Sequence, residues 1–234
     1  MRLNRRTFGF LKELIFPSRC LNCLDQTAKG EVLCEKCKET IELNQTLFCG
    51  QCLARLPEGK RICHRDFPYT LGAALDYKNE AVRKLVLGLK FAGAKDAAKF
   101  LGNCLVEYVH FVPIMWQDFL IVPVPLGQKR KNQRGYNQSQ MIAEILAKSF
   151  AAKISTENLV RIKNTPPQSE INSFDKRIRN VEGVFAIKNT SEFENRKVIL
   201  VDDVTTSGAT LKEAAMVIKN CRPKSIVALT AARA

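Results

Sequence analysis

The sequence predicts an α/β fold in which a mainly parallel sheet is flanked by helices and preceded by a small cysteine-rich module. The stretches 119–126 and 198–201 are continuously apolar, as expected for parallel strands that are covered on both faces. Segments with the apolar spacing of helices alternate with these strands along the chain. Seven of the nine cysteines lie within residues 20–63, which distinguishes the amino-terminal part from the rest.

Length and composition bound the class of protein. With 234 residues, of which 46% are hydrophobic, the chain can bury a substantial core. No apolar run is long enough to cross a bilayer, so we expect no membrane span. Residues 1–16 are predicted to form a short amphipathic helix rather than a signal peptide, because Lys12 and Glu13 interrupt the apolar run and no small-residue cleavage site follows. We therefore expect a cytoplasmic protein.

The first four cysteines have the spacing of a zinc ribbon. They form two Cys-x-x-Cys pairs separated by ten residues: Cys20, Cys23, Cys34 and Cys37. Paired knuckles of this kind present four thiolates tetrahedrally to one Zn²⁺. A disulfide framework is the alternative, and it is disfavoured because no secretory signal accompanies the cysteines. The sequence thus predicts one zinc site here.

The next three cysteines repeat this spacing without a fourth. Cys49, Cys52 and Cys63 match the first three ligands, and the repeat places the fourth ligand at Asp66. His64 is the other candidate, since zinc accepts both carboxylate oxygen and imidazole nitrogen. A second ribbon without metal is the remaining alternative.

The larger unit is expected to span 67–234, after a ribbon unit over 1–66. It opens with a weakly alternating strand at 71–77. Apolar residues at helical spacing then predict two helices within 80–109, broken near Gly93. A final strand is expected near the carboxyl end of the chain.

Two basic stretches lie where they could reach an anion. Lys90 stands beside the break between the two helices, where it either reaches a phosphate or favours the helix end by its charge. The loop 127–138 carries four cations directly after the strand 119–126. Open α/β sheets bind ligands at the carboxyl ends of their strands, so we predict that this loop binds pyrophosphate through Arg134. Asn137 is expected to cap the next helix.

The segment 164–180 has the profile of a lid. Its paired prolines exclude regular structure, and it carries basic residues, among them Arg177. Short strands are expected on either side, at 159–163 and 183–187. We predict that the segment closes over an anionic transition state, with Arg161 contributing from the preceding strand. A plain surface excursion is the alternative.

The stretch after 198–201 combines two acids with a phosphate cradle. Asp202 and Asp203 end the strand. A run of small and hydroxyl residues then leads into a helix: Thr205, Thr206, Ser207, Gly208, Ala209 and Thr210. Such a run lets backbone amides and the positive end of the helix close on an anion. The acids would repel a phosphate, so they should serve the vicinal hydroxyls of a ribose or a bridging Mg²⁺. A sugar phosphate suits both the acid pair and the phosphate cradle. The alternative is a strand followed by an ordinary acidic helix cap.

The motif V-I-L-V-D-D-V-T-T-S-G-A-T at 198–210 resembles the phosphoribosyl pyrophosphate loop of the type I phosphoribosyltransferases. The resemblance implies the type I phosphoribosyltransferase fold for the larger unit. It also implies that Asp202 and Asp203 hold the ribose 2′- and 3′-hydroxyls and Mg²⁺, while residues 205–210 bind the 5′-phosphate. The cations expected at the pyrophosphate or in the lid are Arg134, Arg161 and Arg177.

The order of motifs along the whole chain resembles that of the ComF family. After the Cys-x-x-Cys ribbons come V-P-V-P-L at 122–126, R-G-Y-N-Q at 134–138, T-P-P-Q at 165–168 and V-D-D at 201–203. Members of this family are amidophosphoribosyltransferase-like proteins linked to DNA uptake in natural competence. The resemblance therefore implies single-stranded DNA and proteins of the competence machinery as partners. The chain departs from the family pattern at Asp66, where a cysteine is usual.

Three functions are compatible with the sequence. An enzyme would use phosphoribosyl pyrophosphate and Mg²⁺ and displace pyrophosphate from the anomeric carbon. A protein without catalytic activity would bind single-stranded DNA and keep the pocket, and a regulator would use the pocket as a switch. The formal net charge of +14 favours an anionic substrate or a polyanionic partner. The acceptor of a transfer reaction has no signature in the sequence.

Overall fold

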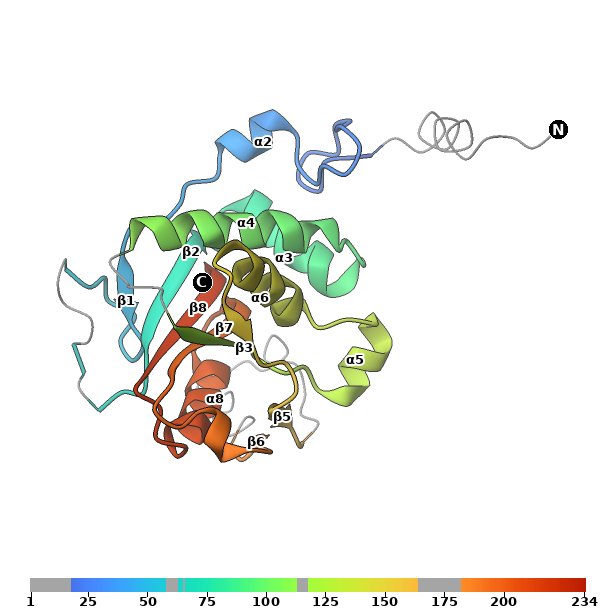
Figure 1. Cartoon of the computed structure of the whole chain (residues 1–234). Coiled ribbons are helices and arrows are strands. Elements are labelled where there is room, and N and C mark those ends of the chain that lie inside the picture. Colours follow the sequence, from blue (N-terminus) through green and yellow to red (C-terminus); the bar gives the residue numbers. More distant parts are fainter. Residues whose placement is uncertain (1–17, 58–62, 65, 113–117, 164–181) are drawn as a thin grey trace.

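The centre of the molecule is a six-stranded sheet. The computed structural model describes residues 18–57, 63–64, 66–112, 118–163 and 182–234. The strands of the sheet span Leu47–Cys49 (β1), Thr70–Asp76 (β2), Phe119–Pro123 (β3), Lys153–Ile154 (β4), Lys197–Thr205 (β7) and Ser225–Arg233 (β8). Their order is β1-β2-β8-β7-β3-β4 (Figure 1). Neighbouring strands run parallel except β1 and β2, which are antiparallel.

Helices cover both faces of this sheet. They span Glu80–Phe91 (α3), Asp96–Phe111 (α4), Gln138–Ser149 (α6) and Ala209–Lys219 (α8). The first three lie on one side of the sheet and α8 lies on the other (Figure 1). Alternate residues of β7 divide between the two cores: Ile199 and Val201 pack on the side of α3, α4 and α6, and Val198 and Leu200 on the side of α8. The predicted α/β fold with a mainly parallel sheet is confirmed.

The break between α3 and α4 lies where the sequence predicts it. Asn79 caps α3, because its side-chain oxygen accepts a hydrogen bond from the amide of Val82 at 3.2 Å. Gly93, between the two helices, adopts a φ of +69°. Residues with a side chain rarely adopt this conformation, so a glycine here lets the chain turn into α4.

The basic stretch after β3 is a helix, and the prediction of a loop was wrong. This helix, α5, spans Gln128–Arg134. It ends at Gly135, which has a φ of +75° and donates its amide to the Lys131 carbonyl at 2.8 Å. Gln, Lys and Arg favour helix, and a left-handed glycine is a common helix end. Asn137 caps α6 as predicted, accepting from the amide of Ser139 at 3.2 Å.

A second, two-stranded sheet lies beside the first. It pairs β5 (Leu159–Arg161) with β6 (Phe185–Ile187) in antiparallel orientation, and a short 3₁₀ helix, η2 (Thr190–Glu192), follows. In the register, Arg161 lies opposite Phe185. The predicted lid at 164–180 lies outside the described residues, as does the predicted helix at 1–16.

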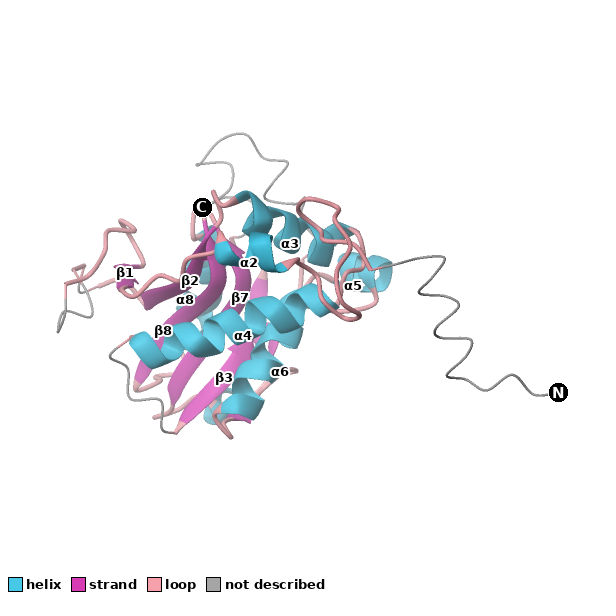
Figure 2. Cartoon of the chain, turned by 90° about the horizontal axis from the view of Figure 1, so that it is seen from above, coloured by secondary structure: helices cyan, strands magenta, loops and turns pink. Residues whose placement is uncertain are grey.

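The second cysteine set is built onto the edge of the main sheet. The first set surrounds a short helix, α2 (Glu35–Glu39), whereas Cys49 is the last residue of β1. β1 lies at the outer edge of the sheet (Figure 2). A unit boundary after residue 66 remains a prediction, and strand pairing joins the two sides of it. Among the described helices, none has both the length and the apolar composition needed to cross a membrane.

Candidate functional site

A cavity of about 380 Å³ opens at the carboxyl ends of β3 and β7. The end of α3, the helix α5, the start of α6, β5 and the segment 202–211 contribute to its wall. This is the edge of an open α/β sheet where ligands bind. The strand β7 continues past both acids to Thr205, so the acids are held by the sheet and not by a loop.

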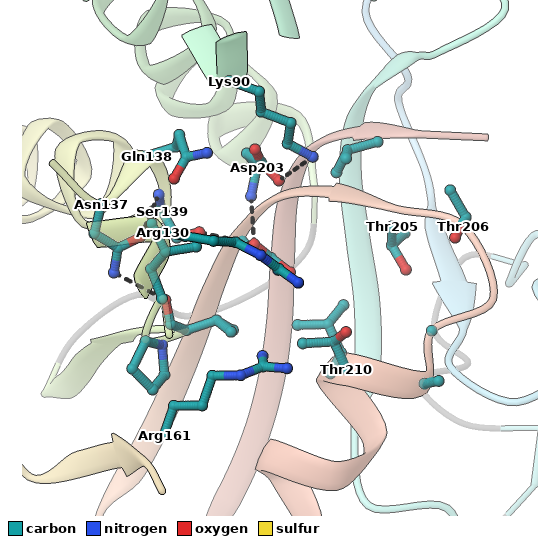
Figure 3. A pocket seen from close by; sticks show the side chains of 18 of the residues that line it. Lys90, Arg130, Asn137, Gln138, Ser139, Arg161, Asp203, Thr205, Thr206 and Thr210 are labelled. Carbon is teal, nitrogen blue, oxygen red and sulfur yellow. Dashed lines mark hydrogen bonds and ion pairs between the residues drawn. The ribbon is translucent and has the colours of Figure 1, made fainter. Parts of the chain in front are cut away.

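The two acids have different partners. Asp202 Oδ1 accepts hydrogen bonds from Ser139 Oγ at 2.7 Å and from the amide of Asp203 at 2.9 Å. Asp203 is buried, and its Oδ1 pairs with Lys90 Nζ at 3.1 Å (Figure 3). The other carboxylate oxygen of Asp203, Oδ2, is buried without a hydrogen-bond partner among the described residues. A buried oxygen of this kind is suited to a hydroxyl donor or a cation.

The environment of Asp202 disfavours its charge. Burial, and then the neighbouring Asp203 carboxylate, raise the pKa of Asp202 to about 7, although Lys90 and the Ser139 hydrogen bond act in the opposite direction. Near neutral pH this acid is therefore only partly ionised. A ligand that brings a cation to the pair would favour the ionised form.

The segment after β7 has the form of an anion cradle. Thr205 is buried at the end of the strand, Thr206 is exposed, and Gly208 precedes α8 with a φ of +71°. Among the described residues, no hydrogen bond engages the backbone amides of Thr206, Ser207 and Gly208. These amides lie next to the amino end of α8, where an anion is stabilised by both the N–H groups and the helix dipole.

Four cations come from three different elements. They are Lys90 of α3, Arg130 and Arg134 of α5, and Arg161 of β5. The side chains of Arg130 and Arg161 extend toward the same space in front of Thr210 (Figure 3). Burial, and then the charge of Arg130, lower the pKa of Arg161 to about 10, with Asp202 opposing. Arg161 therefore stays charged at neutral pH, and an anion between these guanidinium groups would relieve their repulsion.

The structure gathers most of the predicted site residues around this one cavity. Lining it are Asp202, Asp203, Thr205, Thr206, Ser207, Gly208, Ala209, Thr210, Arg134 and Arg161. Arg177 lies outside the described residues. Sequence reasoning missed Ser139, since a serine in the first turn of a helix looks like an ordinary helix start. For Lys90 the sequence predicted either contact with a phosphate or a favourable charge at a helix end, whereas in the structure its partner is Asp203.

The first cysteine set forms a compact cluster. The sulfur atoms of Cys20, Cys23, Cys34 and Cys37 all lie within 4.8 Å of one another. The Sγ atoms of Cys23 and Cys34 are 3.5 Å apart, close to the roughly 3.8 Å that a tetrahedral zinc with bonds of about 2.3 Å requires. These four residues therefore fit Zn²⁺.

The second set gathers around His64. Its Nδ1 lies 3.3 Å from Cys49 Sγ and 3.1 Å from Cys63 Sγ, and Cys52 Sγ lies 3.5 Å from Cys63 Sγ. The Asp66 side chain, predicted as the fourth ligand, does not belong to this group, and the Asp66 carbonyl accepts from Lys219 Nζ at 3.4 Å. The structure thus favours a Cys₃His set, which also fits zinc. The sequence left the choice between Asp66 and His64 open, and the structure favours His64.

The thiols of the second cluster are arranged for a cation. Burial opposes ionisation of Cys49, but the amide of Cys52 and the side chains of Cys63 and His64 lower its pKa to about 6. The Cys49 thiolate, then burial, raise the pKa of Cys63 to about 12. A second thiolate is therefore unfavourable unless a metal ion neutralises the group.

Comparison with known families agrees with this architecture. Residues 136–234 match the phosphoribosyl transferase domain, and residues 11–65 match the double zinc ribbon domain. The chain is thus a protein with a phosphoribosyltransferase domain and an amino-terminal double zinc ribbon.

The relatives of this chain are named as competence proteins or DNA utilization proteins. Competence protein F of Haemophilus influenzae is 27% identical over 229 residues, covering 94% of this chain and 98% of that protein. DNA utilization protein YhgH of Escherichia coli K12 is 28% identical over 203 residues, with 85% and 83% covered. Competence protein ComFC of Bacillus subtilis is 36% identical over 99 residues, with 42% and 38% covered. The resemblance to the ComF family is confirmed, and the chain is a homologue of these competence and DNA utilization proteins.

Proposed function

We propose that the cavity binds phosphoribosyl pyrophosphate together with Mg²⁺. The observation that carries the proposal is the placement of an acid pair and an open amide cradle on one cavity wall, 202–211, with four cations facing them. Acids suit ribose hydroxyls and a divalent cation, amides at a helix start suit a phosphate, and guanidinium groups suit a pyrophosphate.

Each part of the ligand has a matching part of the site. Asp202 and Asp203 would hold the ribose 2′- and 3′-hydroxyls and Mg²⁺, and the buried Oδ2 of Asp203 is available for such a contact. Residues 205–210 would hold the 5′-phosphate. Arg134 and Arg161 would contact the pyrophosphate, and Arg130 joins them by its position (Figure 3).

The reaction that this arrangement supports is displacement of pyrophosphate from the anomeric carbon by an acceptor nucleophile. When bound, Mg²⁺ would neutralise charge on the leaving group. The guanidinium groups would stabilise the negative charge that grows on the departing oxygen, and the acids would fix the orientation of the ribose. No protein residue has to form a covalent bond.

Calorimetry with phosphoribosyl pyrophosphate, with and without Mg²⁺, tests the binding. We expect Mg²⁺-dependent binding that is lost in the double variant Asp202→Asn, Asp203→Asn and retained in Glu144→Gln, which removes an exposed acid of α6. Binding that survives loss of both acids would refute the assignment. Pyrophosphate release with candidate acceptors then distinguishes an enzyme from a sensor that only binds.

A second candidate function is binding of single-stranded DNA. It is favoured by the net charge of +14 and by the words "DNA utilization" in the name of relatives. In this role the protein would act in the cytoplasm, together with proteins of the competence machinery. We expect affinity for a single-stranded oligonucleotide to fall steeply with salt, and to persist in the Asp202→Asn, Asp203→Asn variant if the two sites are distinct. Binding that does not change at high salt would contradict an electrostatic origin.

A further inference from the structure

The second cysteine cluster lies directly behind the anion cradle. A Cβ atom built on Gly208 would lie 3.2 Å from Tyr69 Oη and 3.9 Å from the carbonyl oxygen of Gly50. Gly50 follows Cys49 in the chain, so the backbone of this metal knuckle is nearly in contact with the residue that turns the cradle into α8. Tyr69 fills the remaining space between them.

Tyr69 is packed firmly in this position. It is only 2% exposed, its ring meets that of Phe67 edge to face at 4.9 Å, and its hydroxyl has no partner among the described residues. A Cβ on Gly50 would lie 2.5 Å from the Phe67 ring and 2.7 Å from the Tyr69 carbonyl oxygen. The knuckle, Phe67 and Tyr69 therefore pack without spare room, and a shift of the knuckle has to move the tyrosine.

A second connection reaches the cradle from the other flank. Arg233 of β8 lies opposite Thr205 in the sheet. Its guanidinium stacks 4.1 Å from the Phe48 ring and donates to the Leu53 carbonyl at 3.2 Å. Leu53 belongs to the turn that follows Cys49 and Cys52, so the cradle is connected to the second ribbon at two points, near Thr205 and at Gly208.

We infer that the cluster of Cys49, Cys52, Cys63 and His64, with its metal bound, positions the 5′-phosphate cradle, so that metal binding and sugar-phosphate binding favour each other. The inference rests on the proposed function of the cavity. Cys49 is held by β1, but Cys52, Cys63 and His64 are exposed, so the outer part of the cluster depends on its metal for a fixed shape. Without the metal the turn that carries Gly50 and Leu53 is held less firmly, and the amides of the cradle no longer keep the spacing that a phosphate requires.

The pyrophosphate side of the cavity supplies an internal control. Its cations come from α5 and β5, which are not part of the connection through Tyr69 and Arg233. Loss of the second metal should therefore weaken ligands that carry a 5′-phosphate and leave pyrophosphate alone almost unchanged.

The first experiment measures binding of ribose 5-phosphate and of pyrophosphate by calorimetry, alongside zinc content. Two zinc ions per chain are expected in the wild type and one in Cys52→Ser. We expect Cys52→Ser to weaken ribose 5-phosphate roughly tenfold, within the usual range of coupling between sites, and pyrophosphate by less than about twofold. One zinc per wild-type chain, or unchanged ribose 5-phosphate affinity in Cys52→Ser, would overturn the inference.

A variant with intact ligands separates positioning from metal loss. Tyr69→Leu should keep both zinc ions yet weaken ribose 5-phosphate, because it removes the side chain between the knuckle and Gly208. Phe193→Leu, which truncates another fully buried aromatic side chain at the end of η2, should keep the affinity. Equal losses in the two variants would mean that general destabilisation, and not positioning, is responsible.

Reciprocity provides a test on the unmodified protein. Because coupling acts equally in both directions, saturating ribose 5-phosphate should protect one of the two zinc ions against a chelator, and pyrophosphate should protect neither. Equal protection of both ions, or of none, would contradict the coupling. If the wild type binds neither ribose 5-phosphate nor phosphoribosyl pyrophosphate, the proposed function fails too, whereas normal binding without coupling removes only this inference.

Discussion

Asp202 and Asp203 are neighbours on one strand but meet different surroundings. Asp203 has a lysine partner, whereas Asp202 has hydrogen bonds and a nearby like charge. The acid pair therefore combines a fixed counter-ion with a carboxyl that is only partly ionised near neutral pH.

The raised pKa of Asp202 makes the stability of the ligand-free protein depend on pH. The folded state favours the neutral carboxyl of Asp202. Its contribution to the free energy of unfolding is therefore fully present below the pKa of the unfolded state and is lost as the pH rises through about 7. We expect Asp202→Asn to stabilise the ligand-free protein at pH 8, by up to about 4 kcal/mol for a pKa raised from 3.8 to about 7, and to have little effect at pH 4. Denaturant unfolding at the two pH values measures this. A gain that is larger at pH 4 than at pH 8 would show that the sign is wrong.

Lys90 is predicted to stabilise the fold through Asp203. Replacing it with Met leaves a buried carboxylate without its counter-ion, which should cost about 1–3 kcal/mol in the free energy of unfolding. The double variant Lys90→Met, Asp203→Asn should recover much of this loss, because the charge that needs a partner is gone. Additive losses in the double-mutant cycle would mean that the pair does not interact energetically.

At the scale of elements, most of the site is assembled by features that the sequence displays. The apolar runs of β3 and β7 and the cap Asn137 specify strands and a helix start without reference to the rest of the chain. What escaped prediction depends on contacts between distant segments. Lys90 and Ser139 reach the acids only after α3 and α6 pack on the sheet. The choice between His64 and Asp66, which the sequence left open, likewise depends on the folded chain.

Substitution of Gly208 tests how closely the segment between β7 and α8 is packed. Gly208→Ala should cost roughly 1–2 kcal/mol for its left-handed conformation, and more because its Cβ meets Tyr69. Gly93→Ala is a matched control, with a φ of +69° and nothing within 4 Å of the added Cβ. Thermal unfolding should therefore show the larger loss for Gly208→Ala, and ribose 5-phosphate binding should weaken only in that variant. Equal losses would remove the argument for close packing behind the cradle.

At the scale of the whole molecule, the amino-terminal part is more than an appendage. β1 covers the edge of β2, and the fully buried Phe48 contributes to the core on the side of α8. The Asn44 side chain donates to the carbonyl of Ala73 in β2 at 2.9 Å, which extends the attachment.

Truncation measures that attachment. A chain of residues 67–234 loses β1 and Phe48 from the core, so we expect its unfolding midpoint to fall on the order of 10 °C below that of 42–234, which keeps β1 and the second cluster. Calorimetry of the two chains, each with zinc, gives the comparison. Equal midpoints would support the boundary after residue 66 as a true structural division.

The strand that carries the acids, β7, pairs with β8 on one side and with β3 on the other, and β3 is distant from it in the sequence. Val122 of β3 lies opposite Leu200 of β7, across a long intervening stretch of chain. Closing so large a loop is slow and happens only when many contacts form together. A half-folded chain emerging from the ribosome should therefore have no partial affinity for its ligand, and recognition should appear all at once when the last strands, β7 and β8, join the sheet.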